Sequence, residues 1–266
     1  MRRLILVRIV TELQDAPAVL ARQPDITRTE SVAMVCHDLR TPLAAIKEAL
    51  ALLTETAGSQ LDERQRRYLT VAREEIDRLN RMVNNLVEVS RMDSGRVVLN
   101  SDAIDLPELL STAIESLSPL VSKRNLVVKR NIASHLPPVM GDPDRLLRVF
   151  NNILDNAIKY SPPGGTIRVD IGSVAPGSSV LAQKGILAGA GYIEVTVSDD
   201  GPGIPTEALD RIFDQFECVD PRGPGTGLGL AIVRSIVEMH HGKVWAESTL
   251  GQGARFHLIL PFKGNS

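Results

Sequence analysis

The stretch Val32-Ala-Met-Val-Cys-His-Asp-Leu-Arg-Thr-Pro-Leu43 decides how this chain is interpreted, because it places a reactive side chain within a patterned helix. Asp38 follows His37 directly, and Thr41 lies one helical turn beyond His37 on the same face. A neutral imidazole is a nucleophile near neutral pH, and a neighbouring carboxylate accepts its proton or fixes its tautomer. Taken alone, this pair is more often a surface histidine beside a chance acid.

Apolar residues around this stretch repeat at alternating steps of four and three, the spacing of helices in a bundle. In the first segment they are Val35, Leu39, Pro42, Ile46, Ala49 and Leu53. After a break at residues 57–59 a matching pattern of fours and threes follows, in which Gln65 and Ser90 are polar: Leu61, Gln65, Tyr68, Ala72, Ile76, Leu79, Val83, Leu86 and Ser90. The two segments predict an antiparallel helical hairpin that belongs to a bundle, with Val35 and Leu39 pointing into the bundle and His37 facing solvent.

One such hairpin cannot bury two apolar seams alone, whereas two hairpins do so as a four-helix bundle. We therefore expect a homodimer. Pro42 has no N–H to donate to the carbonyl of Asp38, so a bend in the helix is expected beside His37.

The composition excludes several classes of protein. The 266 residues suffice for two modest domains, and a net charge of -2 gives no general surface for nucleic acid. The two cysteines, Cys36 and Cys218, form neither a disulfide framework nor a metal site and fit a reducing compartment. No apolar stretch approaches the roughly 20 residues of a membrane span, and Arg8 interrupts the apolar start. A cytoplasmic protein is expected, with a fragment of a larger receptor as the alternative.

Helical and strand patterns alternate after the second helix ends at Asp93-Ser-Gly95. Helices are predicted over 105–121, 142–160 and 228–239, and strands over 126–129, 166–171, 193–198, 243–247 and 255–260. These elements predict an α+β sandwich with helices on one face of a mostly antiparallel sheet. Residues 172–191 are predicted as a flexible connection, and 1–22 as an amphipathic helix. The predicted domains are 1–30, 31–95 and 96–266.

Three later segments carry candidate ligand groups. In Asn151–Ser161, the side chains of Asn152, Asn156 and Lys159 share one helix face, where amide oxygens suit Mg²⁺ and a lysine suits phosphate. In Val195–Ile204, Asp199 ends an apolar strand and two glycines follow. A carboxylate there is placed to accept from an adenine amino group. By themselves, these are a solvated helix face and an ordinary turn.

The third segment, Gly225–Val233, is a glycine-rich turn that opens into an apolar helix. Such a turn presents backbone N–H groups and a helix N-terminus to phosphate. It is not a Walker loop, since no Gly-Lys-Ser/Thr follows, and no long βαβ unit makes it a Rossmann turn.

The His37 stretch resembles the phosphoacceptor box of bacterial sensor histidine kinases, His-Glu/Asp-x-Arg-Thr-Pro-Leu. The three later segments, in this order, are similar to the ATP-binding boxes of the same family and of its relative DNA gyrase. The resemblance covers residues 31–262. It implies that ATP phosphorylates His37, that Asp38 orients or deprotonates it, and that Thr41 positions water for dephosphorylating a regulator. Cys36 replaces the usual serine, and a packing role for it is preferred over a redox role.

The resemblance also implies roles in nucleotide binding. Asn156 is the implied Mg²⁺ ligand, with Asn152 on the same face and Lys159 and Tyr160 near the phosphates and ribose. Asp199 is the implied adenine acceptor, and Gly201 and Gly203 shape the base pocket. The implied phosphate-binding residues are Gly225, Thr226, Gly227, Leu228 and Gly229. Residues 212–216 resemble the family's phenylalanine box within a mobile lid of about 205–226, which includes Arg222.

The implied partner is the receiver domain of a response regulator, whose aspartate takes the phosphoryl group. Residues 1–30 are a signalling helix, a docking site for a separate sensor protein, or the remainder of a missing N-terminal sensor. Two alternatives stay open: a phosphatase of the regulator that uses Thr41, and a pseudokinase scaffold. A gyrase-like ATPase would share the pocket but would not explain the helical hairpin.

Overall fold

The computed structural model describes residues 25–57, 61–93, 98–175, 178, 191–220 and 225–262. The helix predicted over 1–22 and most of the connection predicted over 172–191 lie outside these residues. The chain divides into two compact units, Met1–Val97 and Val98–Ser266. Among the helices of the described residues, none combines the length and the apolar composition that crossing a bilayer requires.

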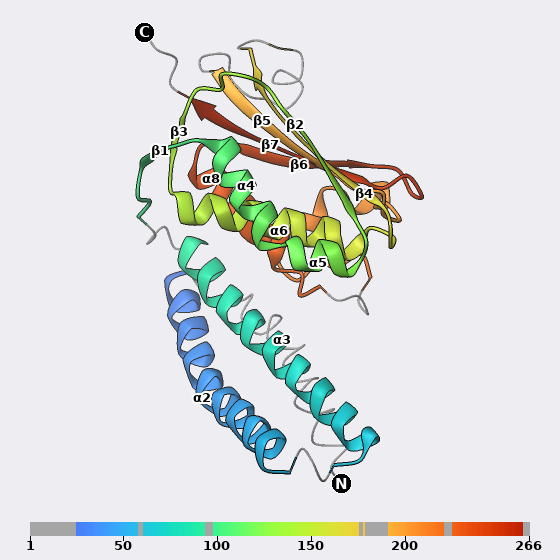
Figure 1. Cartoon of the computed structure of the whole chain (residues 1–266). Coiled ribbons are helices and arrows are strands. Elements are labelled where there is room, and N and C mark those ends of the chain that lie inside the picture. The colour runs from blue at the N-terminus through green and yellow to red at the C-terminus, as the bar shows by residue number, and fades with distance from the viewer. Residues whose placement is uncertain are drawn as a thin grey trace. The chain divides into compact units, whose positions relative to one another are not determined.

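The first unit contains two long helices, α2 over Asp25–Ala57 and α3 over Glu63–Asp93 (Figure 1). They lie side by side as a hairpin, which confirms the predicted element. Helix α2 continues through Pro42 and does not end there.

Two polar contacts define the antiparallel register of α2 and α3. Nζ of Lys47 lies 2.8 Å from Oδ1 of Asp77. Two helical turns earlier in α2 and two turns later in α3, Nη2 of Arg40 donates to Oδ1 of Asn84 at 3.2 Å. Both contacts are exposed, so they contribute little to stability, but they show which turns face each other.

The apolar contact between α2 and α3 uses the predicted residues of α3, but on α2 it only partly coincides with the predicted stripe. Its buried residues are Cys36, Leu43, Ile76, Val83 and Val87, with Leu39, Leu50, Leu79 and Leu86 partly buried around them. Val35 and Leu53 are instead 52% and 49% exposed. Val35 therefore does not pack against α3 of its own hairpin, and the prediction that it points into a bundle of two hairpins stays a prediction. The helices meet one position further along, at Cys36, and the stripe that contains Val35 is left exposed.

The second unit is built on a five-stranded sheet of order β2-β4-β5-β7-β6. The strands are β2 (Val127–Ile132), β4 (Thr166–Val174), β5 (Gly191–Ser198), β6 (Lys243–Ser248) and β7 (Ala254–Phe262). Strand β2 runs parallel to β4, and the other neighbouring pairs are antiparallel. The predicted mostly antiparallel sheet is confirmed.

A small second sheet pairs β1 (Asp102–Ile104) with β3 (Val139–Gly141). These strands are missing from the sequence prediction because three residues are too few to show an alternating pattern.

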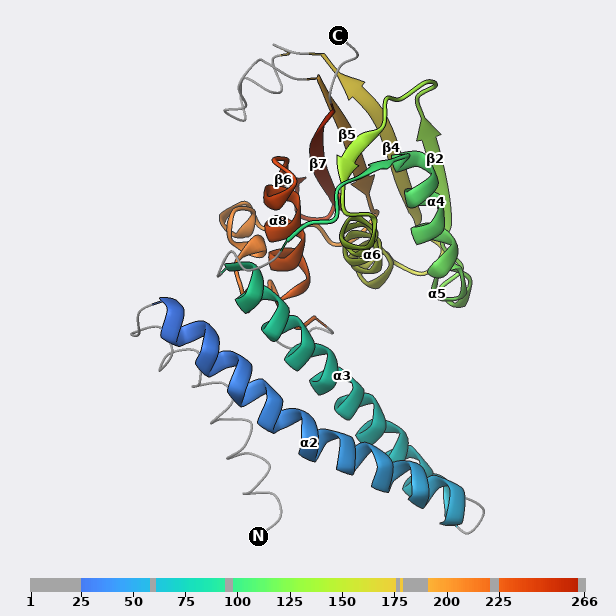
Figure 2. The ribbon, with the colours of Figure 1, turned by 90° about the vertical axis from the view of Figure 1, so that its left-hand side faces the viewer.

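Helices cover one face of the large sheet (Figure 2). They are α4 (Leu106–Ser116), α5 (Ser118–Lys123), α6 (Pro143–Tyr160) and α8 (Gly229–Met239). Alternate strand residues such as Ile167, Val169, Val195 and Val197 are buried beneath them. A helical hairpin followed by an α+β domain is the fold class that the sequence predicts.

The predicted helix over 105–121 is two helices in the structure. Asp105 caps α4 as predicted, because its Oδ1 accepts from the N–H of Glu108 at 3.1 Å. Helix α4 ends at Ser116, since Pro119 has no N–H with which to continue the hydrogen-bond ladder. Helix α5 then begins a new turn.

Helix α6 has the start and end that the sequence predicts. Oδ1 of Asp142 accepts from the N–H of Arg145 at 3.1 Å, and Pro143 occupies the first turn, where its missing N–H costs nothing. The helix ends at Tyr160, before two prolines.

Candidate nucleotide-binding site and phosphoacceptor helix

Helix α6 carries four of the predicted site residues. Its buried face, which includes Ile153 and Ala157, packs into the core of the second unit. Asn152, Asn156 and Lys159 are half-buried on the neighbouring face. Nζ of Lys159 lies 2.5 Å from Oδ2 of Asp155, one turn earlier, so the lysine has a counter-ion on its own helix.

The amide of Asn152 carries an unused hydrogen-bond donor. Its Nδ2 is buried and has no hydrogen-bond partner among the described residues. Its Oδ1 lies against the start of α8, where a Cβ on Gly229 would be 3.5 Å away. A buried donor without a partner costs free energy, which a bound acceptor would recover. Asn152 therefore marks a place suited to a polar ligand.

The loop after β5 carries two neighbouring acidic residues that differ in burial and in hydrogen-bond partners. Asp199 is buried, and its Oδ1 accepts from the N–H of Gly201 at 2.8 Å. Burial raises the pKa of this carboxyl. Asp200 is exposed and accepts from the N–H of Thr166 at 2.9 Å and from Nη1 of Arg168 at 3.1 Å. The bond from Thr166, with that from Arg168, lowers the pKa of Asp200. Asp200 thus anchors the loop to β4, and Asp199 is the buried acceptor.

Close packing explains two glycines of this loop. A Cβ on Gly201 would lie 3.0 Å from the carbonyl oxygen of Tyr160. Gly203 has φ of +78° and would meet the carbonyl oxygen of Thr249 at 2.3 Å. The loop therefore runs between the end of α6 and the turn that follows β6, with no room for a side chain at either position.

The turn between β6 and β7 is a part of the site that the sequence analysis misses. Oγ of Ser248 accepts from the N–H of Ile204 at 2.8 Å and donates to the carbonyl of Gly253 at 2.6 Å. Gly253, with φ of +79°, lies so close to Asp199 that a Cβ would be 1.9 Å from its carbonyl oxygen. The Gly251-Gln-Gly253 spacing was the available signal for this second glycine turn.

The glycine-rich segment meets α6 at two points. A Cβ on Gly225 would lie 3.5 Å from the hydroxyl of Tyr160, and Gly229 faces Asn152 as described above. Gly227 has φ of +69°, and its carbonyl accepts from the N–H of Phe216 at 2.9 Å. Oγ1 of Thr226 accepts weakly from the N–H of Leu228 at 3.4 Å. The structure therefore brings all three sequence segments together around the second half of α6.

The first residues of the phenylalanine box are held against α8. Phe213 is buried edge-on against Phe256, with ring centroids 6.4 Å apart. Arg234 stacks over Phe213 at 5.1 Å, and its Nη1 lies 2.9 Å from Oδ1 of Asp214. Phe216 is 41% exposed. The lid predicted over 205–226 thus begins with a segment held in the core; Arg222 lies outside the described residues.

Residues that are candidates for Mg²⁺ fit the ion by their chemistry. The side chain of Asn156 is half-buried on α6, and its amide oxygen is a hard neutral ligand. No group of three or more His, Cys, Asp or Glu side chains gathers in the described part of the chain. Mg²⁺ beside phosphates takes one or two protein ligands and keeps several waters, so a single Asn fits this role.

His37 lies in α2 between a buried and an exposed residue. Cys36 is fully buried against α3, and burial raises the pKa of its thiol, which favours the packing role for this residue. Asp38 and Thr41 are exposed. The predicted exposure of His37 stays a prediction, because its side chain lies outside the part that the structure describes.

Comparison with known families assigns both units. Residues 27–95 match the family model described as "His Kinase A (phospho-acceptor) domain". Residues 141–264 match "Histidine kinase-, DNA gyrase B-, and HSP90-like ATPase".

Similar proteins and structures agree with this assignment. Adaptive-response sensory kinase SasA of Synechococcus sp. (strain JA-2-3B'a(2-13)) is 35% identical over 252 residues, which are 94% of this chain and 63% of that protein. Sensor histidine kinase WalK of Bacillus subtilis (strain 168) is 35% identical over 90% of this chain and 37% of its own length. The chain thus spans about three fifths or less of these relatives.

The crystal structure of full-length ShkA in complex with AMPPNP aligns with a TM-score of 0.71 and 30% identity, covering 89% of this chain and 46% of that one. With a phosphoacceptor domain followed by an ATPase domain in one chain, this protein belongs to the family of two-component sensor histidine kinases.

Proposed function

We propose that this chain is an ATP-dependent protein-histidine kinase that phosphorylates His37 and passes the phosphoryl group to an aspartate of a response regulator. The observation that carries the proposal is the convergence of three glycine-bearing and amide-bearing segments around α6. The same chain carries the His37 box on α2.

ATP would use groups that are positioned in the second unit. Buried Asp199 would accept from the adenine amino group. Gly201 and Gly203 let the backbone beside it pack closely. The unused donor on Asn152 bonds an oxygen of the ligand. The glycine segment before α8 offers backbone N–H groups and the positive end of the helix to the phosphates.

Asn156 would hold Mg²⁺, which neutralises charge on the phosphates when bound. Lys159 adds a second positive charge to the same region. Lys159 is paired with Asp155, so it would bind phosphate by exchanging one anionic partner for another.

Transfer to His37 conserves atoms and charge. A ring nitrogen of His37 attacks the γ-phosphorus, a P–N bond forms, the bond to the bridging oxygen breaks and ADP leaves. Asp38, exposed and adjacent in sequence, accepts the ring proton. Because such transfers have little covalent chemistry for the protein to do, positioning and charge neutralisation supply most of the catalysis.

A homodimer is part of the proposal. The exposed stripe of α2 includes Val35, Ile46 and Leu53, and α3 exposes Tyr68 and Val71. Large apolar side chains in one row, next to a seam already used within the hairpin, suit burial by a second hairpin in a four-helix bundle.

Labelling with γ-phosphate-labelled ATP tests the proposal. The wild-type protein should give an acid-labile, alkali-stable phosphoprotein, as phosphohistidine does, and His37→Gln should give none. His135→Gln, which alters an exposed histidine far along the sequence, is the matched control and should label normally. Full labelling of His37→Gln would show that the acceptor is another residue.

A phosphatase of the regulator is the second candidate, because Thr41 is exposed one turn from His37. In that case Thr41→Ala slows the loss of phosphate from a labelled regulator and leaves labelling of His37 intact. A protein that binds ATP but never labels would be the pseudokinase scaffold.

A further inference from the structure

The C-terminal end of α6 is held by a residue outside the three nucleotide segments. Arg124 follows α5, and its Nη1 donates to the carbonyls of Ile158 and Lys159, both at 2.6 Å. Its Nη2 donates to the carbonyl of Ser161 at 3.1 Å. The last carbonyls of a helix have no partner within the helix, so one guanidinium satisfies three acceptors there.

The backbone around Arg124 holds the following turn as well. The carbonyl of Arg124 accepts from the N–H of Gly164 at 3.1 Å, and the N–H of Val127 donates to the carbonyl of Gly165 at 3.0 Å. Both bonds reach the turn that ends α6. The side chain of Arg124 therefore bonds to the end of α6, and the main chain of residues 124–127 bonds to the turn that follows it.

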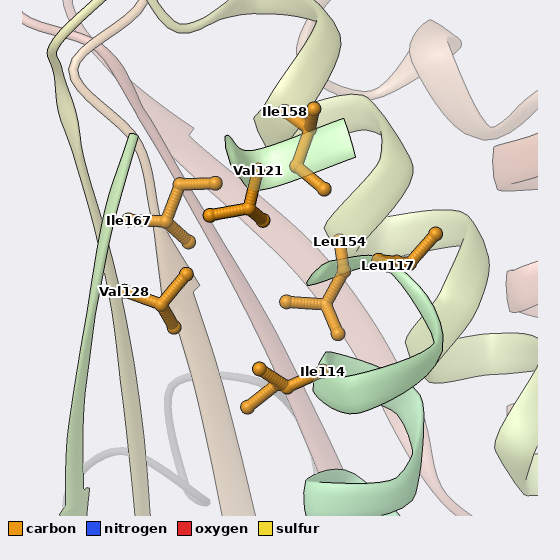
Figure 3. Close-up of a pocket in the computed structure, with 7 residues that line it drawn as sticks. All are labelled: Ile114, Leu117, Val121, Val128, Leu154, Ile158 and Ile167. Atoms are coloured by element: carbon orange, nitrogen blue, oxygen red, sulfur yellow. The ribbon is translucent and has the colours of Figure 1, made fainter. Parts of the chain in front are cut away.

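Apolar side chains connect α5, which precedes Arg124, to its neighbours in the second unit. Figure 3 shows Val121 of α5 close to Ile158 of α6 and Ile167 of β4, in a cluster completed by Ile114, Leu117, Val128 and Leu154. Apolar side chains line the small gap between these residues, which is open on one side and has room for about one water. Apolar contacts on one side of α5 thus join the segment before Arg124 to α6 and β4, although no residue of α5 is fully buried.

The gripped turn is the one that contacts the rest of the site. Tyr160 lies between the bonded carbonyls of Lys159 and Ser161; its own carbonyl abuts Gly201, and its hydroxyl lies near Gly225. A shift of this turn would move Tyr160 against both loops. The direction of Lys159 would change with it.

Charge gives Arg124 a second effect. The C-terminus of a helix carries about half a negative charge, which repels phosphate. The proposed site places phosphates beside the second half of α6, the unfavourable end. A guanidinium bonded to the terminal carbonyls offsets that negative charge.

We propose that Arg124 is a positioning residue of the nucleotide site: it fixes the last turn of α6, with Lys159 and Tyr160, and offsets the negative end of that helix where the phosphates bind. This inference rests on the proposed function, since it assumes that ATP occupies this site.

The test compares Arg124→Met, Arg124→Lys and the control Arg130→Met in the full chain. Arg130 is an exposed arginine on β2, whose described side-chain bond is a long 3.4 Å contact to Ser111, so this control removes the same charge from the same domain. Dissociation constants for ATP, ADP and AMP are measured by calorimetry, at a temperature where circular dichroism shows each variant folded.

Arg124→Met should weaken ATP binding about tenfold, or about 1.4 kcal/mol, with a smaller loss for ADP and the smallest for AMP. A purely structural role would weaken all three equally. Arg124→Lys keeps the charge but loses the planar fork, so the dependence on phosphate number should largely disappear while ATP binding stays about threefold weaker than in the wild type. Arg130→Met should bind as the wild type does.

The proposal is overturned if Arg124→Met binds ATP as tightly as Arg130→Met does, or if its loss is the same for AMP as for ATP. Should Arg124→Met not fold, Arg124→Lys decides: wild-type ATP binding and wild-type labelling of His37 in that variant would contradict the positioning role. Failure of the wild-type protein to bind ATP would instead refute the proposed function itself.

Discussion

The backbone N–H of Asp142 donates to Nε2 of His240 at 2.9 Å, so that the last residue before α6 is bonded to the residue that caps α8. Nδ1 of the same imidazole donates to the carbonyl of Ile236 at 2.8 Å. These two partners assign the neutral tautomer with its proton on Nδ1. His240 is buried against Gly141, where a Cβ would lie 2.6 Å from the ring. The two helices of the nucleotide site are thus joined by one neutral histidine.

Acid should weaken the second unit through His240. Burial lowers the pKa of His240, and Asp142, Arg145 and His241 are the charged groups that act on it. The unfolded chain then binds the proton more readily than the folded one, so the stability from the neutral ring is complete above about pH 6.5 and is lost as the pH falls below it. Urea unfolding at pH 7.5 and pH 5.5 measures this loss. His240→Gln, which cannot titrate, should show a smaller difference; an equal difference would assign the acid sensitivity to other groups.

Asp199→Asn should raise stability and abolish tight ATP binding. Burial raises the pKa of Asp199, which means that the folded chain disfavours its charge. The amide keeps an oxygen to accept from Gly201 and carries no charge, so the thermal midpoint should rise. Its NH₂ group faces the adenine amino group as donor against donor, and ATP affinity should fall about a hundredfold. Differential scanning calorimetry and ATP titration measure the two effects; a lower midpoint would contradict the cost assigned to the buried charge.

Gly253→Ala should be strongly destabilising, and Gly251→Ala is its matched control. Both glycines have positive φ, +79° and +80°. A Cβ on Gly253 would meet the carbonyl oxygen of Asp199, whereas a Cβ on Gly251 has nothing within 4 Å. Gly251→Ala should cost about 1 kcal/mol for the backbone conformation alone. Gly253→Ala should cost about 3 kcal/mol, because the clash adds to it, and should weaken ATP binding. Chemical denaturation of the two variants would give equal losses if Gly253 had no packing role.

Ile46→Glu should convert the proposed dimer to a monomer without unfolding the hairpin. Ile46 is 45% exposed in the single chain and is not part of the apolar cluster between α2 and α3, so a charge there should leave that cluster in place. Ala51→Glu places the same charge at an exposed position on another face of α2. Light scattering after size exclusion should show a monomer for Ile46→Glu and a dimer for the control. A dimeric Ile46→Glu with normal helicity would place the interface elsewhere.

The elements that sequence could predict are those whose signals are local. The start of α6 is an example, because the capping acid and proline at Asp142-Pro143 depend on no distant residue. The glycines at 201 and 203 were predictable as a close approach, although their neighbours, Tyr160 and Thr249, were not.

Features that depend on partners distant in sequence were not predictable. His240 ends a helix with no pattern around it, and its meaning comes from Asp142, 98 residues away. The α2 residues that contact α3 were not predictable for a related reason. Helix α2 has two adjacent apolar stripes, one through Val35 and one through Cys36. Periodicity alone does not say which stripe its own α3 covers.

The hydrogen bond from Phe216 to Gly227 has a consequence for how this family of pockets diversifies. It joins the last residue of the phenylalanine box to the residues just before α8. The entropic cost of closing a loop grows only with the logarithm of its length, so residues can be gained or lost above this bond with little effect on the pocket below. The length of the connection between Phe216 and Gly227 can therefore vary while the elements on either side of it, the phenylalanine box and α8, keep their positions.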